Sequence, residues 1–151
     1  MNDFQRGFLD RATAEAVKAS HPFPPMAAAE AALESNWGNS QLAREANNLF
    51  GMKAHKNQAL SCTLVLPTRE FLNGNWVACS ANWVEYADWG ACFADRLATL
   101  ERLANVYPHY AAALAAADAE TYITEVSKTW STDPDRAKKV LSIYQEYTAQ
   151  P

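Results

Sequence analysis

Glu34 is the side chain whose surroundings in the sequence best suit catalysis. It lies at the end of residues 27–34, a segment rich in alanine and leucine that we expect to be helical because both are strong helix formers. Trp37 and Gly38 end the helix and leave the carboxyl on its last turn, beside a hydroxyl and an indole. Burial among apolar groups raises the pKa of a carboxyl, so that it can donate a proton near neutral pH. Glu34 is therefore predicted to be a general acid.

A short second helix is expected to follow this acid. Asn39 or Ser40 can cap its start, and residues 41–46 carry it to the pair Asn47 and Asn48. An apolar turn, Leu-Phe-Gly-Met, comes next and brings an aromatic ring close to the end of both helices.

Residues 31–53 also form a dense motif. It reads Ala-Ala-Leu-Glu-Ser-x-Trp-Gly at 31–38, then Ser40, Leu-Ala at 42–43, and Ala-Asn-Asn-Leu-Phe-Gly-Met-Lys at 46–53. This run resembles the core of glycoside hydrolase family 73, the peptidoglycan-cleaving endo-β-N-acetylglucosaminidases. Goose-type lysozymes and lytic transglycosylases also place a catalytic Glu before Ser, but their following segments usually lack the Asn-Asn-Leu-Phe-Gly run. The resemblance implies a lysozyme-like fold, Glu34 as the acid and no cofactor.

A second catalytic group is suggested by Thr68-Arg-Glu70, which resembles the Thr-x-Glu that family members carry in a β-lobe. There the glutamate is a candidate base that activates water. A separation of about 6.5–9.5 Å between Glu34 and Glu70 would leave room for that water and give inversion. Two alternatives stay open. Glu70 could be a solubilising charge on a strand edge, or the 2-acetamido oxygen of the substrate could attack the anomeric carbon.

The largest departure from the family pattern is Trp130. Many members carry Tyr in a Gly-Tyr-Ala-Thr-Asp-Pro stretch near the site, and this chain has Thr-Trp-Ser-Thr-Asp-Pro at 129–134. An indole can stack on a sugar, but its N–H only donates, so a role specific to a phenol would be lost. Either the Tyr is dispensable here or activity is reduced. Tyr122 and Tyr144 are possible substitutes, although core packing is expected for both.

The remaining predicted site residues would bind the sugar. Asn47 and Asn48 could hydrogen-bond acetamido groups or, equally well, cap the preceding helix. The side chains of Phe50 and Trp130 are expected to line the groove, and that of Trp37 either lines the groove or packs in the core. These five residues are our candidate substrate-binding set.

Other titratable groups are given structural or surface roles. Glu30, one turn before Glu34, is expected to be solvated, although a like charge so close could also favour protonation of one of the pair. His21 lies among prolines and is expected at the surface. His21, His55 and His109 share no ligand spacing, so no metal is implied.

The wider pattern predicts an α+β, mainly helical fold with one β-hairpin at about 61–83. Asn73-Gly74 lies between β-forming runs and is a strong type I′ turn signal. Its register would place Cys79 opposite Thr68, so a disulfide to Cys62 is not expected. We expect helices at about 4–19 capped by Asp3, 24–36, 41–46, 89–104 capped by Asp88, 108–117, 119–129 capped by Asp118, and 135–147.

Length and composition suit one catalytic domain spanning residues 1–151. The charge of -4, with no basic stripe, argues against a nucleic-acid partner. No apolar run approaches the ~20 residues of a membrane span. The first residues lack the apolar core of a signal peptide. We therefore expect a monomer made in the cytoplasm that reaches the cell wall by release or delivery, as a phage endolysin or a secreted toxin would. An excised autolysin domain is the other possibility.

These observations lead to one main hypothesis and two rivals. The main one is a peptidoglycan hydrolase that cleaves the β-1,4 bond after N-acetylglucosamine. A muramidase or lytic transglycosylase acting on the neighbouring bond is the rival of the same class. The rival of a different class is a glycan-binding or assembly module with weak catalysis, which the loss of the Tyr would allow.

Overall fold

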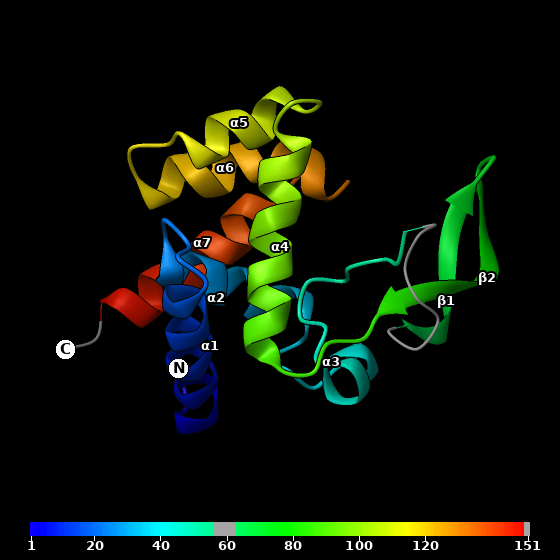
Figure 1. Ribbon diagram of the computed structural model, residues 1–151, viewed down its shortest axis with the longest axis horizontal. Helices are drawn as coiled ribbons and strands as arrows, with labels where there is room; N and C mark the ends of the chain where they lie inside the picture. The colour runs from blue at the N-terminus through cyan, green and yellow to red at the C-terminus, as the bar shows by residue number, and fades with distance from the viewer. Residues whose placement is uncertain (56–62, 150–151) are drawn as a thin grey trace.

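The computed structural model describes residues 1–55 and 63–149. A body of helices lies to one side, and a two-stranded antiparallel hairpin projects from it (Figure 1). This agrees with the predicted mainly helical α+β class. In chain order the elements are α1 (Asp3–Lys18), α2 (Pro24–Glu34), α3 (Gln41–Ala46), β1 (Thr63–Leu72), β2 (Asn75–Val84), α4 (Trp89–Leu103), α5 (Pro108–Leu114), α6 (Ala119–Trp130) and α7 (Arg136–Thr148).

Helix α2 is the centre of the body. Every residue from Met26 to Ala32 is fully buried, and α2 contributes to both hydrophobic clusters of the core. Alanine on all faces allows α1 and α7 to pack close to it, since a helix that is apolar all round must be enclosed. One cluster joins α2 to α1 and the start of α4, and the other joins it to the end of α4, α5, α6 and α7.

The end of α2 is fixed by Ser35 and a left-handed turn. The Ser35 hydroxyl donates to the Ala31 carbonyl at 2.6 Å and accepts the Gly38 N–H at 2.8 Å. Asn36, Trp37 and Gly38 then all have positive φ, between 50° and 77°. A Cβ on Gly38 would lie 3.1 Å from the Phe8 ring, so both the backbone angle and the close approach favour glycine. The chain therefore leaves α2 sharply, and Glu34 stays at its end.

The hairpin has the register that its turn predicted. Thr68 pairs with Cys79, and Leu72 pairs with Asn75 across Asn73-Gly74, both of which have positive φ. At its base the hairpin joins the body through backbone hydrogen bonds from Ala54 to Asn82 and from Val84 to Met52. The prediction of a hairpin at about 61–83 is thus confirmed over Thr63–Val84, while Cys62 lies outside the described residues.

Most predicted helix caps are confirmed and one is wrong. Ser40, Asp88 and Asp118 each accept a backbone N–H in the first turn of their helices. Helix α1 is capped by Asn2, because its side chain and that of Gln5 form a reciprocal capping box, which moves Asp3 into the first turn. Within the described part of the chain, no helix combines the length and apolar character needed to cross a bilayer.

Candidate active site

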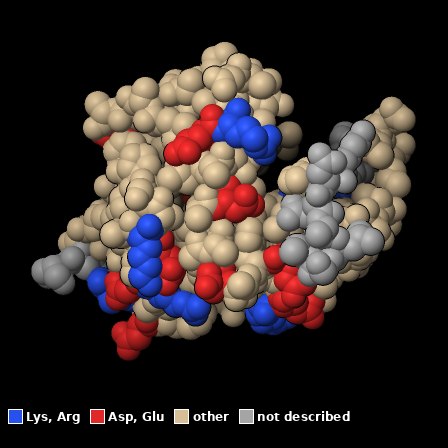
Figure 2. All heavy atoms as spheres, viewed as in Figure 1, with Lys and Arg blue, Asp and Glu red and all other residues tan. Residues whose placement is uncertain are grey.

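Glu34, the last residue of α2, lies in a groove between the helical body and the hairpin. The residue is exposed at the helix end, but its side chain is only 25% exposed. The groove has a volume of about 780 Å³, and the surface is visibly hollowed between body and hairpin in Figure 2. Several of the residues that line the groove are aromatic. The lining residues are Glu34, Phe50, Gly51, Met52, Lys53, Arg69, Trp76, Trp83, Thr99, Leu103, Tyr110, Trp130, Ser131 and Thr132.

Arg136, the first residue of α7, holds the Glu34 carboxylate. Its Nε donates to Glu34 Oε1 at 2.8 Å. Its other two nitrogens are also engaged: Nη1 donates to Ser127 Oγ at 2.8 Å, and Nη2 donates to Glu30 Oε2 at 2.7 Å. A guanidinium bound through all three nitrogens has a fixed plane, so the direction of the Nε–H toward Glu34 is fixed as well.

Glu30 is the centre of a buried ionic cluster, and the expectation that it is solvated is wrong. Its side chain is completely buried and also binds both terminal nitrogens of Arg96, at 2.9 and 3.2 Å. Tyr122 donates its hydroxyl to Glu30 Oε1 at 2.8 Å. Burial alone would raise the Glu30 pKa, but the guanidiniums of Arg96 and Arg136 outweigh it and lower that pKa to about 2. Glu30 therefore acts as a permanent anion beneath the groove.

His21 is a second correction, because it is buried instead of lying at the surface. Its Nδ1 accepts the Phe23 N–H at 3.0 Å, and its Nε2 lies 3.2 Å from the Tyr122 hydroxyl. Burial lowers the His21 pKa to about 4 even though Glu30 acts in the opposite direction. The ring is thus neutral at physiological pH and supports Tyr122 within the same cluster.

Phe50 and Trp130, two of the predicted substrate-binding residues, line the groove, and both rings contact the Arg96 guanidinium. The Arg96 guanidinium lies 4.1 Å from the centre of the Trp130 ring and 4.8 Å from that of Phe50. Arg96 is therefore sandwiched by two rings while it pairs with Glu30. Tyr110, which reasoning from the sequence missed, lies 6.3 Å from Trp130 in the same wall.

The two predicted amides are not among the residues that line the groove. Asn47 has positive φ at the end of α3 and donates to the carbonyls of Tyr86 and Ala87. Asn48 is buried, donates to the carbonyls of Met52 and Val84, and accepts the Met52 N–H. Both side chains join the motif to the segment at the end of the hairpin instead of capping α3, and Asn47 ends that helix through its left-handed backbone alone.

Trp37 also lies away from Glu34's groove. It packs edge-on against Phe8, with ring centres 6.1 Å apart, and lines a separate hollow of about 460 Å³ with Arg11 and Trp89. Its place near the predicted acid in sequence does not bring it to the same surface, because the left-handed turn after α2 reverses the chain.

Glu70 lies in β1, where its backbone pairs with Val77. Its side chain lies outside the described residues, so the predicted separation from Glu34 stays a prediction. The neighbouring Arg69 lines the groove, as does Trp76 on the other strand. The hairpin therefore supplies one wall of the groove that contains Glu34.

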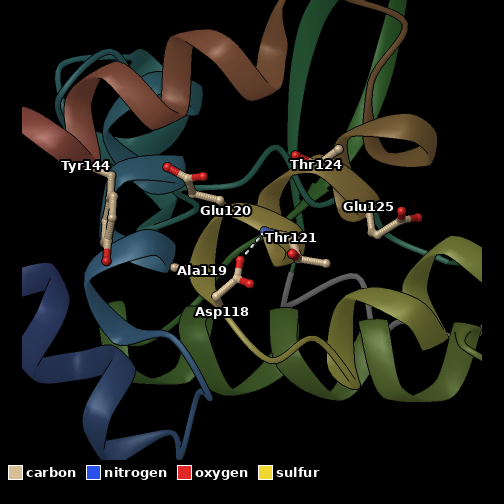
Figure 3. Close-up of a pocket in the computed structure, with 7 residues that line it drawn as sticks. All are labelled: Asp118, Ala119, Glu120, Thr121, Thr124, Glu125 and Tyr144. Atoms are coloured by element: carbon tan, nitrogen blue, oxygen red, sulfur yellow. Dashed lines mark hydrogen bonds between the residues drawn. The ribbon is translucent and has the colours of Figure 1, made fainter.

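A different hollow, of about 530 Å³, lies at the start of α6 (Figure 3). It is lined by acidic and hydroxyl side chains, and Asp118 there caps the helix by accepting the Thr121 N–H. Tyr144, a possible substitute for the family Tyr, lines this hollow and is not among the residues that line the groove of Glu34. Across residues 1–55 and 63–149, no three His, Cys, Asp or Glu side chains gather as a metal site would require.

A carboxyl at the end of a buried helix, sharing an aromatic groove with a hairpin, is the arrangement of a lysozyme-like glycoside hydrolase. Comparisons with known proteins identify a family within this class of enzymes. The family model described as "Glucosaminidase: Mannosyl-glycoprotein endo-beta-N-acetylglucosaminidase" matches residues 11–149. The solved glycoside hydrolase domain of FlgJ from Salmonella typhimurium superposes with a TM-score of 0.76 at 31% identity, covering 97% of this chain and 99% of that domain.

Curated relatives give the same result. Peptidoglycan hydrolase FlgJ of Salmonella typhimurium is 34% identical over 126 residues, which is 80% of this chain and 38% of that protein. Exo-glucosaminidase LytG of Bacillus subtilis is 29% identical over 150 residues, 96% of this chain and 52% of that protein. The chain belongs to the glucosaminidase family, glycoside hydrolase family 73. It spans about half or less of the length of these curated relatives.

Proposed function

We propose that this protein is an endo-β-N-acetylglucosaminidase that hydrolyses the β-1,4 bond after N-acetylglucosamine in the glycan strands of bacterial peptidoglycan. The observation that carries the proposal is Glu34, a carboxyl at the end of α2 in a groove walled by Trp130, Tyr110 and Trp76. Aromatic faces suit the stacking of sugar rings, and a carboxyl in that wall suits protonation of a glycosidic oxygen. The catalytic unit we propose is one domain spanning residues 1–151.

Glu34 would protonate the leaving oxygen in this reaction. The bond from the anomeric carbon to that oxygen breaks, and water finally adds at the anomeric carbon. The water could be activated by Glu70, or the acetamido oxygen of the substrate could first capture the anomeric carbon. Both routes use the same acid, so the assignment of Glu34 does not depend on the choice between them.

The direct test is sacculus solubilisation by the wild type and by Glu34→Gln. Glutamine keeps the shape but cannot donate the proton, so we expect activity to fall by about 10²–10⁴-fold with the fold retained. A Glu34→Gln protein that still clears sacculi at the wild-type rate would rule out this acid. A wild type that pellets with sacculi without dissolving them would instead indicate the glycan-binding module.

Mass spectrometry of the digest tests the bond. Reducing N-acetylglucosamine ends support the proposal, whereas reducing muramic acid or 1,6-anhydro ends identify a muramidase or a lytic transglycosylase. Product length separates an endo from an exo mode, which matters because LytG is named an exo-glucosaminidase. Oligosaccharides of mixed length early in the digest are expected for an endo enzyme.

The proposed substrate also defines the place of action. Peptidoglycan lies outside the cytoplasmic membrane, so we infer that the protein acts on the cell wall as a monomer after release or delivery. An endolysin expressed with a membrane-permeabilising partner should lyse cells from within. Expression without such a partner, compared with expression directed to the periplasm, tests whether access limits lysis.

A further inference from the structure

The contacts of Arg136 suggest more than a structural ion pair. The side chain is buried, begins α7, and reaches Glu34 on α2, 102 residues earlier in the chain. Ser127 and Glu30 hold its two terminal nitrogens, so neither of these can move to a substrate without breaking a buried contact. Among these three bonds of Arg136, the one from Nε to Glu34 Oε1 reaches a residue that lines the groove.

We propose that Arg136 is a positioning residue for the catalytic carboxyl, holding Glu34 Oε1 so that the transferable proton resides on Oε2. The inference rests on the proposed role of Glu34 as acid. A guanidinium is always protonated and only donates, so the oxygen it binds is an acceptor in both protonation states of Glu34. Oε2 of Glu34 is then the oxygen that carries and delivers the proton.

Charge balance in the cluster explains how a carboxyl beside an arginine can still be an acid. Arg136 and Arg96 bring two positive charges, and the buried Glu30 offsets one of them. When Glu34 is ionised the four groups sum to zero, and when it is protonated they sum to one positive charge. Glu30 therefore offsets the charge of one of the two guanidiniums behind Glu34.

The groups that face Glu34 directly or through Arg136 come from every element packed around it. Through Arg136 these are Glu30 on α2, Arg96 on α4, and Tyr122 and Ser127 on α6. In the groove they are Lys53, Arg69 and Tyr110. Burial acts to lower the pKa of Arg136, but Glu30 and Glu34 raise it, so the guanidinium remains charged across the working pH range.

The experiment measures kcat and KM on soluble peptidoglycan fragments from pH 4 to 9. For an acid that must be protonated, activity falls as pH rises through its titration. Arg136→Met removes a positive charge beside the carboxyl, so this fall should move to higher pH. We expect kcat to drop at least about tenfold, with KM nearly unchanged, because the carboxyl is no longer held.

Two charge variants separate positioning from electrostatics. Arg136→Lys keeps the positive charge but loses the contact through three nitrogens. We therefore expect a lower kcat, while the pH at which activity declines stays near that of the wild type. Glu30→Gln removes the offsetting anion, so the fall should move to lower pH, opposite to Arg136→Met. Lys138→Met, which removes an exposed charge on the same helix, is the matched control and should change neither quantity.

Each result bears on one of the two proposals. If Glu34→Gln is inactive while Arg136→Met and Glu30→Gln keep the wild-type kcat and pH profile, the positioning role is overturned and the acid stands. A fully active Glu34→Gln overturns the acid itself. If Arg136→Met does not fold, Ser127→Ala takes its place, because it removes one contact of Arg136 without changing the charge. Ser127→Ala must then lower kcat at an unchanged melting temperature. An unchanged kcat in that variant contradicts the inference.

Discussion

The two walls of the groove differ in how they are supported. The helical wall contains Glu34 and Trp130, and behind it lie the buried Glu30, Arg96 and Arg136, in which Glu30 pairs with both arginines. The hairpin wall is largely exposed and contacts the body mainly at its base (Figure 1). A catalytic acid needs a fixed geometry, whereas a wall that stacks on sugar rings tolerates small displacements. We infer that the helical wall positions the proposed acid, and that the exposed rings of the hairpin contribute to binding.

Deletion of the buried anion should produce the largest change in stability. Glu30→Ala leaves Arg96 and Arg136 without their shared partner in the interior, and such uncompensated charges cost about 3–5 kcal/mol. Urea denaturation should show this decrease in the free energy of unfolding. Asp133→Ala, which removes a surface ion pair with Lys139 and an acceptor for the Asp135 N–H, is the control and should cost much less. Equal effects of the two changes would mean that the helical wall is not supported by its buried ions.

His21 makes the helical body sensitive to acid. Its folded pKa is about 4, below the ordinary value of 6.5, so the unfolded chain binds the proton more readily. The stability from neutral His21 is complete above about pH 6.5 and is lost as pH falls toward 4, by up to about 3 kcal/mol. Denaturation at pH 7, 5.5 and 4 checks the slope, and His21→Phe should flatten it. A slope unchanged in His21→Phe would assign the acid sensitivity to other groups.

Local sequence signals predicted most of the fold. Asn73-Gly74 set the hairpin register, and Ser40, Asp88 and Asp118 marked helix starts, because turns and caps depend on residues within a few positions of one another. The place of Glu34 at the end of α2 was predicted in the same way, from Trp37 and Gly38 just beyond it.

The support behind the acid could not be found from local signals. Glu30 is 66 residues from Arg96 and 106 from Arg136, and no spacing rule joins them. One signal was available, however. A segment as apolar as residues 26–32 is enclosed on every face, so a glutamate within it must be buried and needs cations. The burial of Glu30 was therefore predictable from its own helix, whereas the identity of its partners was not.

The smallest effect on stability is expected on the hairpin wall, at Trp76. This indole lines the groove but is 64% exposed, so Trp76→Ala should change the free energy of unfolding by about 0.5 kcal/mol or less. If the hairpin serves binding, loss of a stacking ring costs roughly 1 kcal/mol of substrate affinity, which corresponds to about a fivefold rise in KM with kcat nearly constant. Leu72→Ala removes an exposed apolar hairpin residue that does not line the groove, and should leave KM unchanged. A fall in kcat without a rise in KM for Trp76→Ala would show that the hairpin also takes part in the chemistry, and the division of roles between the two walls would not hold.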